Sequence, residues 1–333
     1  MSISFDSYVG VKTLARKLPV LSTKEFVLLD YERRLQFDGE AGVKNFQSIY
    51  GSFLDIKENY GNYAGIDWQE ETLGRTTTSQ NYRVRISGGN KELQYSLNYT
   101  YFKDLGAMLY SGNDKHNISF SLSHNPTKRI SVNARINYDQ TYIYGMGTSD
   151  QSTRFNKMEH ILQYRPTKGI YGDDESLLKS EEDNITDEEG NPMQNPLTSA
   201  AEETNKRQLR TFQANGGLIF NIAKGLSFRN NTGMRYQTTR NDVFYGEKSS
   251  NGKRSSANGY IQYAENSSFQ TSNVLNYEYK KKKHKLIAML GQEWVSRWTR
   301  NMRASATNFP NNDINLDDMN LGIPGSITSN ANY

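Results

Sequence analysis

The sequence predicts an all-β fold, an antiparallel up-and-down transmembrane β-barrel that is incomplete at about nine strands and has long extracellular loops carrying short helices. Three observations predict it. Apolar and polar residues alternate with a period of two, short and long connections follow one another in turn, and aromatic residues gather near the segment ends. In such barrels short turns lie at one end of the strands, long loops lie at the other, and aromatic girdles flank the apolar band.

The composition is that of a folded, aromatic-rich chain. Its 333 residues include 22 Tyr, 14 Phe and 3 Trp and carry a formal net charge of only +4, whereas disordered chains are poor in aromatics and highly charged. Basic and acidic residues are spread along the chain, which does not favour nucleic-acid binding. The chain has no Cys, and this excludes disulfide frameworks and thiolate metal sites.

The alternation is clearest in segment 93–101, where Leu and Tyr occupy one face and small polar residues occupy the other. Segment 81–88 alternates in the same way, and Gly88-Gly89-Asn90 predicts a tight hairpin turn between the two segments. The same pattern along the chain predicts strands at 2–10, 81–88, 92–101, 117–124, 130–140, 208–222, 226–237, 268–279 and 286–296.

One face of each predicted strand should meet lipid and the other should line the lumen, because a charge on the lipid face at mid-depth costs about 2 to 4 kcal/mol. The residues expected on the lipid face include Leu97, Phe120, Ile136, Phe220 and Leu290. Those expected in the lumen include Gln94, Ser119, Arg135 and Asn231. Interface aromatics are expected at the long-loop ends (Tyr99, Tyr101, Tyr138 and Trp294) and at a short-turn end (Tyr277 and Tyr279).

The lengths of the connections distinguish a membrane barrel from a soluble sandwich. Those at 88–92, 125–129, 223–225 and 280–284 are short, and those at 11–80, 102–116, 141–206 and 238–266 are long. A sandwich gives no reason for every second connection to be long. After Trp298 the chain is rich in Asn, Asp and Gly and does not alternate. The predicted loop insertions are therefore 11–80, 141–206, 238–266 and 297–333.

Two long connections contain helix signals. Ser22-Thr23-Lys24-Glu25 has the pattern of a capping box before an apolar segment, and it predicts a helix that starts there. A second helix is predicted from Ser152 to Tyr164, ended by Pro166.

No chemistry-bearing motif is present, so the chain is expected to be no enzyme and to hold no cofactor and no metal. The four histidines, His116, His124, His160 and His284, fall in separate turns and loops without metal-ligand spacing. Aromatic residues of the long loops could stack on sugar rings, or they could pack the loops against one another, and the sequence does not decide between the two roles. These candidate substrate-contacting residues are Tyr142, Tyr144, Tyr171, Phe244, Tyr245 and Trp298.

Several fragments, in order along nearly the whole chain, resemble the barrel of the SusC/RagA family of TonB-linked outer-membrane proteins. They are Val9 to Leu18 with Pro19-Val20-Leu21-Ser22-Thr23-Lys24-Glu25-Phe26, Asp67-Trp68-Gln69-Glu70, Asn81-Tyr82-Arg83-Val84-Arg85-Ile86-Ser87-Gly88-Gly89, Asn191-Pro192-Met193-Gln194-Asn195-Pro196, Lys224-Gly225-Leu226-Ser227-Phe228, Leu290-Gly291-Gln292-Glu293 and Ala304 to Pro310.

This resemblance implies a TonB-dependent receptor that imports glycans or oligopeptides across the outer membrane of a Gram-negative bacterium. The implied partners are a SusD-like surface lipoprotein, TonB, an oligosaccharide or peptide substrate, and outer-membrane lipid. TonB would act through a plug domain and a box that this chain does not contain. Residues 1–333 are then expected to form a partial barrel without a plug domain or a C-terminal closing strand, and the start has no signal-peptide pattern.

Two other functions stay open from the sequence. One is a secreted β-rich carbohydrate-binding or adhesin domain, which the alternation of loop lengths disfavours. The other is a passive porin, which differs from the importer in lacking coupling to TonB. The sequence does not distinguish the porin from the importer, because the parts that would show coupling lie outside the residues given.

Overall fold

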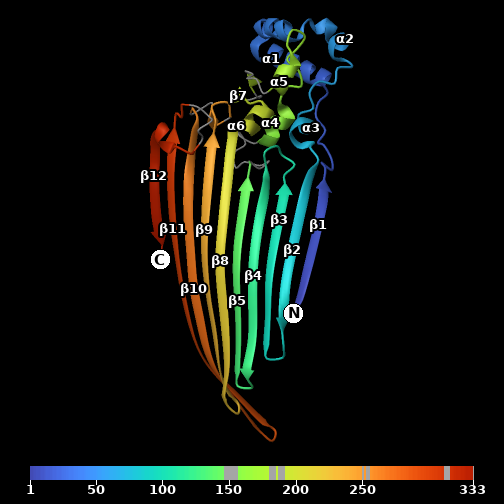
Figure 1. Cartoon of the computed structure of the whole chain (residues 1–333). Coiled ribbons are helices and arrows are strands. Elements are labelled where there is room, and N and C mark those ends of the chain that lie inside the picture. Colours follow the sequence, from blue (N-terminus) through green and yellow to red (C-terminus); the bar gives the residue numbers. More distant parts are fainter. Residues whose placement is uncertain are drawn as a thin grey trace.

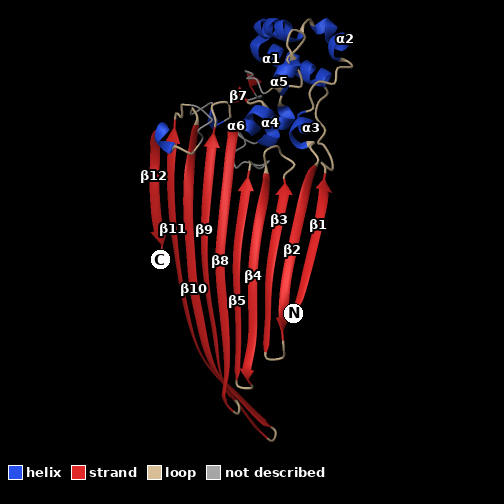
Figure 2. Cartoon of the chain, in the orientation of Figure 1, coloured by secondary structure: helices blue, strands red, loops and turns tan. Residues whose placement is uncertain are grey.

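The structure, a computed structural model, describes residues 1–145, 157–179, 185–186, 192–249, 251–252, 256–310 and 316–332. One antiparallel sheet dominates it, and each of its ten strands pairs with the strands that precede and follow it in that sheet (Figures 1 and 2). The strands are β1 (Ser2–Lys12), β2 (Thr77–Gly89), β3 (Leu93–Leu105), β4 (Gly112–Thr127), β5 (Ile130–Tyr144), β8 (Glu203–Ala223), β9 (Leu226–Tyr245), β10 (Asn258–Lys281), β11 (His284–Thr307) and β12 (Ile323–Asn332).

Helices gather at one edge of the sheet, in the connections β1–β2 and β5–β8 (Figure 2). The first connection holds α1 (Thr23–Tyr50), a 3-10 turn (Phe53–Asp55), α2 (Ile56–Tyr60) and α3 (Trp68–Leu73). The second holds α4 (Lys157–Gln163), α5 (Asp174–Leu178), the paired short strands β6 (Ile185–Thr186) and β7 (Pro192–Met193), and α6 (Pro196–Glu202). A further 3-10 turn (Met319–Leu321) precedes β12.

The predicted fold class is confirmed, because the sheet is antiparallel and sequential throughout. All nine predicted strands are present, but most extend further toward the helical edge than predicted. The connections are correspondingly shorter, at 106–111 instead of 102–116 and at 246–257 instead of 238–266. The alternation pattern does not predict these extensions, because the added residues do not form an apolar face. Their backbone pairing continues nevertheless.

The prediction of a loop over 297–333 is wrong. Residues up to Thr307 continue β11, and Ile323–Asn332 form a tenth strand, β12, paired antiparallel with β11. β12 reads Ile-Pro-Gly-Ser-Ile-Thr-Ser-Asn-Ala-Asn, and its Pro, Gly and Asn residues are depleted in strands. Pairing with a long neighbouring strand outweighs this weak local preference.

The register of the sheet separates an apolar face from a polar face. Leu97, Phe120 and Ile136 are direct partners on neighbouring strands. Arg135 pairs with Ser121 and therefore lies on the face opposite Phe120, as predicted. Nearer the short turns, the apolar face continues as the row Phe220, Phe228, Leu275 and Leu290.

Aromatic residues line the apolar face at two levels. Tyr138, Phe212 and Tyr236 are consecutive partners toward the helical edge, in a row that also contains Tyr99 and Trp298. Tyr277 lies toward the short turns, in the row of Leu226. Ten residues of β9 separate Leu226 from Tyr236, about 33 Å along a strand and about 25 Å across a membrane at the usual tilt.

The prediction that Trp294 lies at the long-loop end is wrong. It pairs with Thr271 in the middle of β11, and its ring lies 5.4 Å from that of Phe269. The misplacement follows from the extra length of β11, which moves the helical edge to Thr307.

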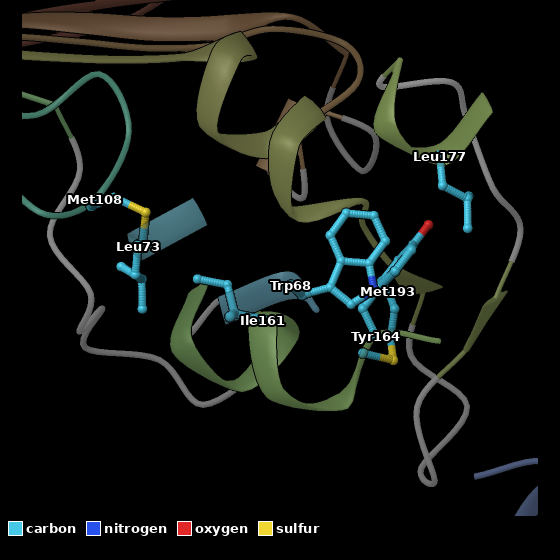
Figure 3. Packing of buried hydrophobic residues seen from close by; sticks show 7 residues of the cluster. All are labelled: Trp68, Leu73, Met108, Ile161, Tyr164, Leu177 and Met193. Carbon is cyan, nitrogen blue, oxygen red and sulfur yellow. The ribbon is translucent and has the colours of Figure 1, made fainter. Parts of the chain in front are cut away.

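Most of the buried apolar residues lie outside the sheet, in the helical connections. One cluster packs α3, α4 and α5 together and contains Trp68, Leu73, Met108, Ile161, Tyr164, Leu177 and Met193 (Figure 3). A second joins the two ends of α1 to α2 and contains Val27, Phe46, Tyr50, Ile56 and Tyr60. We call residues 13–76 and 157–202, as far as they are described, the loop assembly. It has its own hydrophobic core, whereas apolar-face residues of the sheet such as Leu97, Ile136 and Leu290 are exposed.

Candidate functional site: a cleft in the loop assembly

A cleft of about 1600 Å³ lies in the loop assembly. Its walls come from three places that are far apart in the sequence. They are the first half of α1 with the segment before it, residues 64–69, and residues 161–172. The cleft therefore exists only where the connections β1–β2 and β5–β8 meet.

Local sequence sets the position of α1 beside this cleft. Ser22 accepts a hydrogen bond from the backbone N–H of Glu25, and the Glu25 carboxylate accepts one from the backbone N–H of Ser22 at 2.8 Å. This is the predicted capping box. The helix extends to Tyr50 and consists of two parts that meet at Gly39, where φ is 58° and ψ is -135°. The second predicted helix corresponds to α4, and the predicted residues 152–156 lie outside the described ones.

Hydrogen bonds to backbone carbonyl oxygens join the cleft walls to one another. The hydroxyl of Thr23 donates to the carbonyl oxygen of Ala64 at 2.8 Å, and the N–H of Ile66 donates to that of Pro166 at 2.8 Å. The indole N–H of Trp68 donates to the carbonyl oxygen of Arg165 at 2.9 Å. Gly65, with φ of 68°, lies between these contacts, and a Cβ there would be 2.4 Å from the Thr23 hydroxyl oxygen. Only Gly fits this close approach.

Charged groups of both signs line the cleft. The carboxylate of Asp30 is nearly buried and binds the guanidinium groups of Arg34 at 2.6 Å and Arg33 at 3.7 Å. Burial raises the pKa of the neighbouring Tyr50 to about 12, and the Asp30 charge adds to the effect. Arg165 is also buried and lies close enough to Tyr50 to oppose this shift.

Two rings at the cleft are open to solvent. Tyr171 is 77% exposed and Phe37 is 71% exposed, and both belong to its lining. Such rings offer an apolar face to a ligand, while the charged groups of the cleft lining can bind its polar groups. Tyr171 was one of the predicted residues. Phe37 was missed, because it sits in a helix that the alternation pattern did not mark as a site.

The other predicted aromatics lie in strands rather than in loops. Tyr142 and Tyr144 end β5, with ring centroids 5.9 Å apart. Phe244 is buried near the end of β9 and packs edge-on against Phe309 at 5.4 Å. Tyr245 is the last residue of β9, and Trp298 lies within β11, where its ring faces Tyr236. None of these five lines the cleft.

A second hollow, of about 1170 Å³, lies against the polar face of the sheet near the short turns. Its lining includes Arg85, Gln94, Ser121, Arg135 and Asn215, which the register places on one face. This hollowed polar face is the one predicted to line the lumen.

The described residues contain no group of three or more His, Asp or Glu side chains arranged to hold a metal ion. Among the same residues, no helix is long and apolar enough to cross a membrane.

Comparison with known proteins gives one curated relative and several solved structures, and no family model matches the chain. TonB-dependent receptor P3 of Formosa agariphila is 22% identical over 262 residues, which are 78% of this chain and 25% of that protein. The RagAB peptide transporter superposes with a TM-score of 0.69 at 15% identity, over 99% of this chain and 39% of that chain. The RagAB peptide importer in an 'open-open' state gives a TM-score of 0.71 at 14% identity.

The chain thus spans about a quarter of its curated relative and about two fifths of the RagAB chains. Its fold is that of part of the RagAB structures. The resemblance to TonB-dependent receptors of the SusC/RagA type, predicted from the ordered fragments, is confirmed.

Proposed function

We propose that residues 1–333 form part of the barrel wall of an outer-membrane importer in a Gram-negative bacterium. The importer is driven through TonB and works with a SusD-like lipoprotein. One observation carries the proposal. The two faces of a single up-and-down sheet differ, one being apolar and bounded by aromatic rows about 25 Å apart, the other polar and hollowed. The similarity to a TonB-dependent receptor and to RagAB supports it.

In this proposal the helical edge faces the outside and the loop assembly meets the substrate first. Its cleft combines exposed rings with paired charges, which suits a flexible ligand with apolar and polar groups. An oligopeptide is the first candidate, since RagAB is described as a peptide transporter. An oligosaccharide is the second, because Phe37 and Tyr171 could stack on sugar rings.

Membrane placement can be tested with cysteine labels, since the chain has no Cys of its own. Phe120→Cys and Ser119→Cys are neighbours on opposite faces of β4. With a fluorescent label and the chain in bilayers, we expect lipid-borne nitroxides to quench position 120 and aqueous iodide to quench position 119. An adhesin domain would show equal quenching at the two positions.

Import can be tested in the host by deleting the segment that encodes residues 1–333. Growth on oligopeptides or on oligosaccharides as the sole source should then fail, and deleting TonB should cause the same failure. Uptake that continues without TonB would favour the passive porin. Cleft variants Phe37→Ala and Tyr171→Ala should raise the substrate concentration needed for half-maximal uptake. Tyr110→Ala, at a ring that is 60% exposed outside the cleft lining, serves as the matched control.

A further inference from the structure

The short-turn edge of the sheet is strongly basic. The turns and the strand ends next to them carry nine Lys or Arg residues against the two carboxylates Glu92 and Glu278. We call these nine residues the basic rim. They are Lys91, Lys128, Arg129, Lys224, Lys280, Lys281, Lys282, Lys283 and Lys285.

The four turns of the basic rim form one continuous edge, because backbone hydrogen bonds join each to the next. The N–H of Asn125 donates to the carbonyl oxygen of Glu92 at 2.6 Å, which links the β2–β3 and β4–β5 turns. Asn221 donates to Arg129 at 2.8 Å and Glu278 donates to Gly225 at 2.7 Å, which adds the other two turns. The charges are therefore held side by side along the sheet.

Three lysines at the tip of the β10–β11 hairpin have no carboxylate partner. Lys280 and Lys285 both pair with Glu278, which lies on the polar face. In the described part of the chain, Lys281, Lys282 and Lys283 form no ion pair. Lys281 shares the apolar face with Tyr279 and Tyr277, which lie two and four residues before it. Its ammonium group thus lies just beyond the aromatic level that ends the apolar band.

The backbone of this tip does not favour lysine. Lys282 has φ of 50°, in the left-handed region where hairpin turns usually place Gly or Asn. The neighbouring β8–β9 turn uses Gly225, with φ of 82°, in its place. Turn geometry therefore does not account for the lysine at position 282.

The opposite edge carries the opposite charge. The described residues of the long connections include 18 Asp or Glu and 13 Lys or Arg, although the chain as a whole is slightly basic. Positive charge is thus concentrated at the edge that would face the inner leaflet, beside the apolar band. The phosphate groups of a lipid leaflet lie at the same depth as such a rim, and their negative charge is complementary to its positive charge.

We propose that the basic rim binds the phosphate groups of anionic glycerophospholipids in the leaflet that surrounds the short turns. The proposal rests on the membrane placement in the proposed function. Lys281 and its two neighbours make the principal contacts, and the shorter turns extend the surface along the sheet. The rim then fixes the depth of the sheet in the bilayer and selects its surrounding lipid by charge.

The full chain with the single substitution His284→Cys, labelled with a fluorophore, is placed in dodecylmaltoside micelles that contain a small fraction of headgroup-nitroxide lipid. We expect nitroxide phosphatidylglycerol to quench the tip about threefold or more better than nitroxide phosphatidylcholine at low salt. The preference should fall toward one as NaCl is raised, since salt screens exposed charges. It should also fall in Lys281→Gln/Lys282→Gln/Lys283→Gln. The control Lys44→Gln/Lys57→Gln/Lys248→Gln removes equal charge from the helical edge and should leave the preference unchanged.

Equal quenching by the two lipids at low salt in the unsubstituted tip overturns the proposal. So does a preference that inorganic phosphate at millimolar concentration abolishes when NaCl of equal ionic strength does not, because the rim would then be a free-phosphate site. Quenching of a Phe120→Cys label by acyl-chain nitroxides reports insertion separately. Failure of lipid selection therefore leaves the proposed membrane placement standing, and failure of insertion removes both.

Discussion

The side-chain amide of Asn230 donates to the side-chain oxygen Oδ1 of Asn273 at 2.8 Å, across β9 and β10 and on the apolar face of the sheet. Thr232 and Thr271 complete a hydrogen-bonded group of four, with their hydroxyl oxygens 2.9 Å apart. Apolar rows lie on both sides of the group, that of Phe228 toward the turns and that of Met234 toward the helical edge. In lipid the four side chains satisfy one another where no water is available.

Removing one asparagine of this group should lower the free energy of unfolding more than removing both asparagines together. Asn273→Val takes away the acceptor and is expected to lower the free energy of unfolding in detergent by about 1 kcal/mol. Asn230→Val/Asn273→Val should recover much of that loss, because no unsatisfied amide remains between them. Asn231→Val, on the polar face beside the group, is the matched control. Strictly additive losses in a urea titration would show that the two amides are not coupled.

Gly65→Ala should open the cleft without disturbing the sheet. The new methyl group would collide with Thr23 and with the Pro166 carbonyl oxygen, and a left-handed backbone costs a further ~1 to 2 kcal/mol with any side chain. Amide hydrogen exchange of Ile66 is expected to speed up at least about tenfold, equivalent to roughly 1.4 kcal/mol. Exchange in β3 and β4 should not change. Asn62→Ala, an exposed substitution three residues away, provides the baseline, and an unaltered rate at Ile66 would contradict the described contacts.

Lys282→Gly should stabilise the β10–β11 hairpin. Gly tolerates the positive φ at this position, and the expected gain is about 0.5 to 1 kcal/mol in the free energy of unfolding. Lys283→Gly removes the same charge at a residue without a positive φ and should give no gain. Thermal or denaturant unfolding in micelles compares the two variants, and equal stabilities would show that backbone strain at residue 282 is negligible.

Tyr63 in the loop assembly should ionise at a higher pH than an ordinary tyrosine. The phenol of Tyr63 hydrogen-bonds the Asp174 carboxylate at 2.5 Å, and this bond raises the pKa of Tyr63 to about 12. A raised pKa means that the stabilisation is intact below pH 10 and is lost as the pH rises through 12. The tyrosinate absorbance of the unsubstituted chain minus that of Tyr63→Phe should therefore have its midpoint near pH 12. In Asp174→Asn the midpoint should move toward pH 10, and a midpoint near pH 10 in both would contradict the bond.

The sequence predicted the sheet better than the cleft, for physical reasons. Alternation reports whether a strand lies between an apolar and a polar medium, so residues such as Leu97 and Arg135 were assigned to their faces correctly. Trp298 and β12 lie in the part of the sheet beyond the apolar band. The sequence there does not alternate between apolar and polar residues, although the strand pairing continues. Phe37 and Tyr171 line the same cleft although they lie more than 100 residues apart in the chain, and no local sequence pattern encodes this arrangement.

The separate core of the loop assembly constrains the order of folding. Trp68 and Tyr164 pack together with ring centroids 5.1 Å apart, yet strands β2 to β5 lie between them in the chain. Once those four strands have paired, the ends of β2 and β5 at the helical edge are only about 14 Å apart, three strand spacings. Pairing of the hairpins reduces the effective length of the loop that separates the two halves of the core. Most of the conformational entropy cost of closing this loop has then already been incurred when the core packs. We therefore expect the cleft to form late in folding, after the hairpins of β2 to β5 have paired in register.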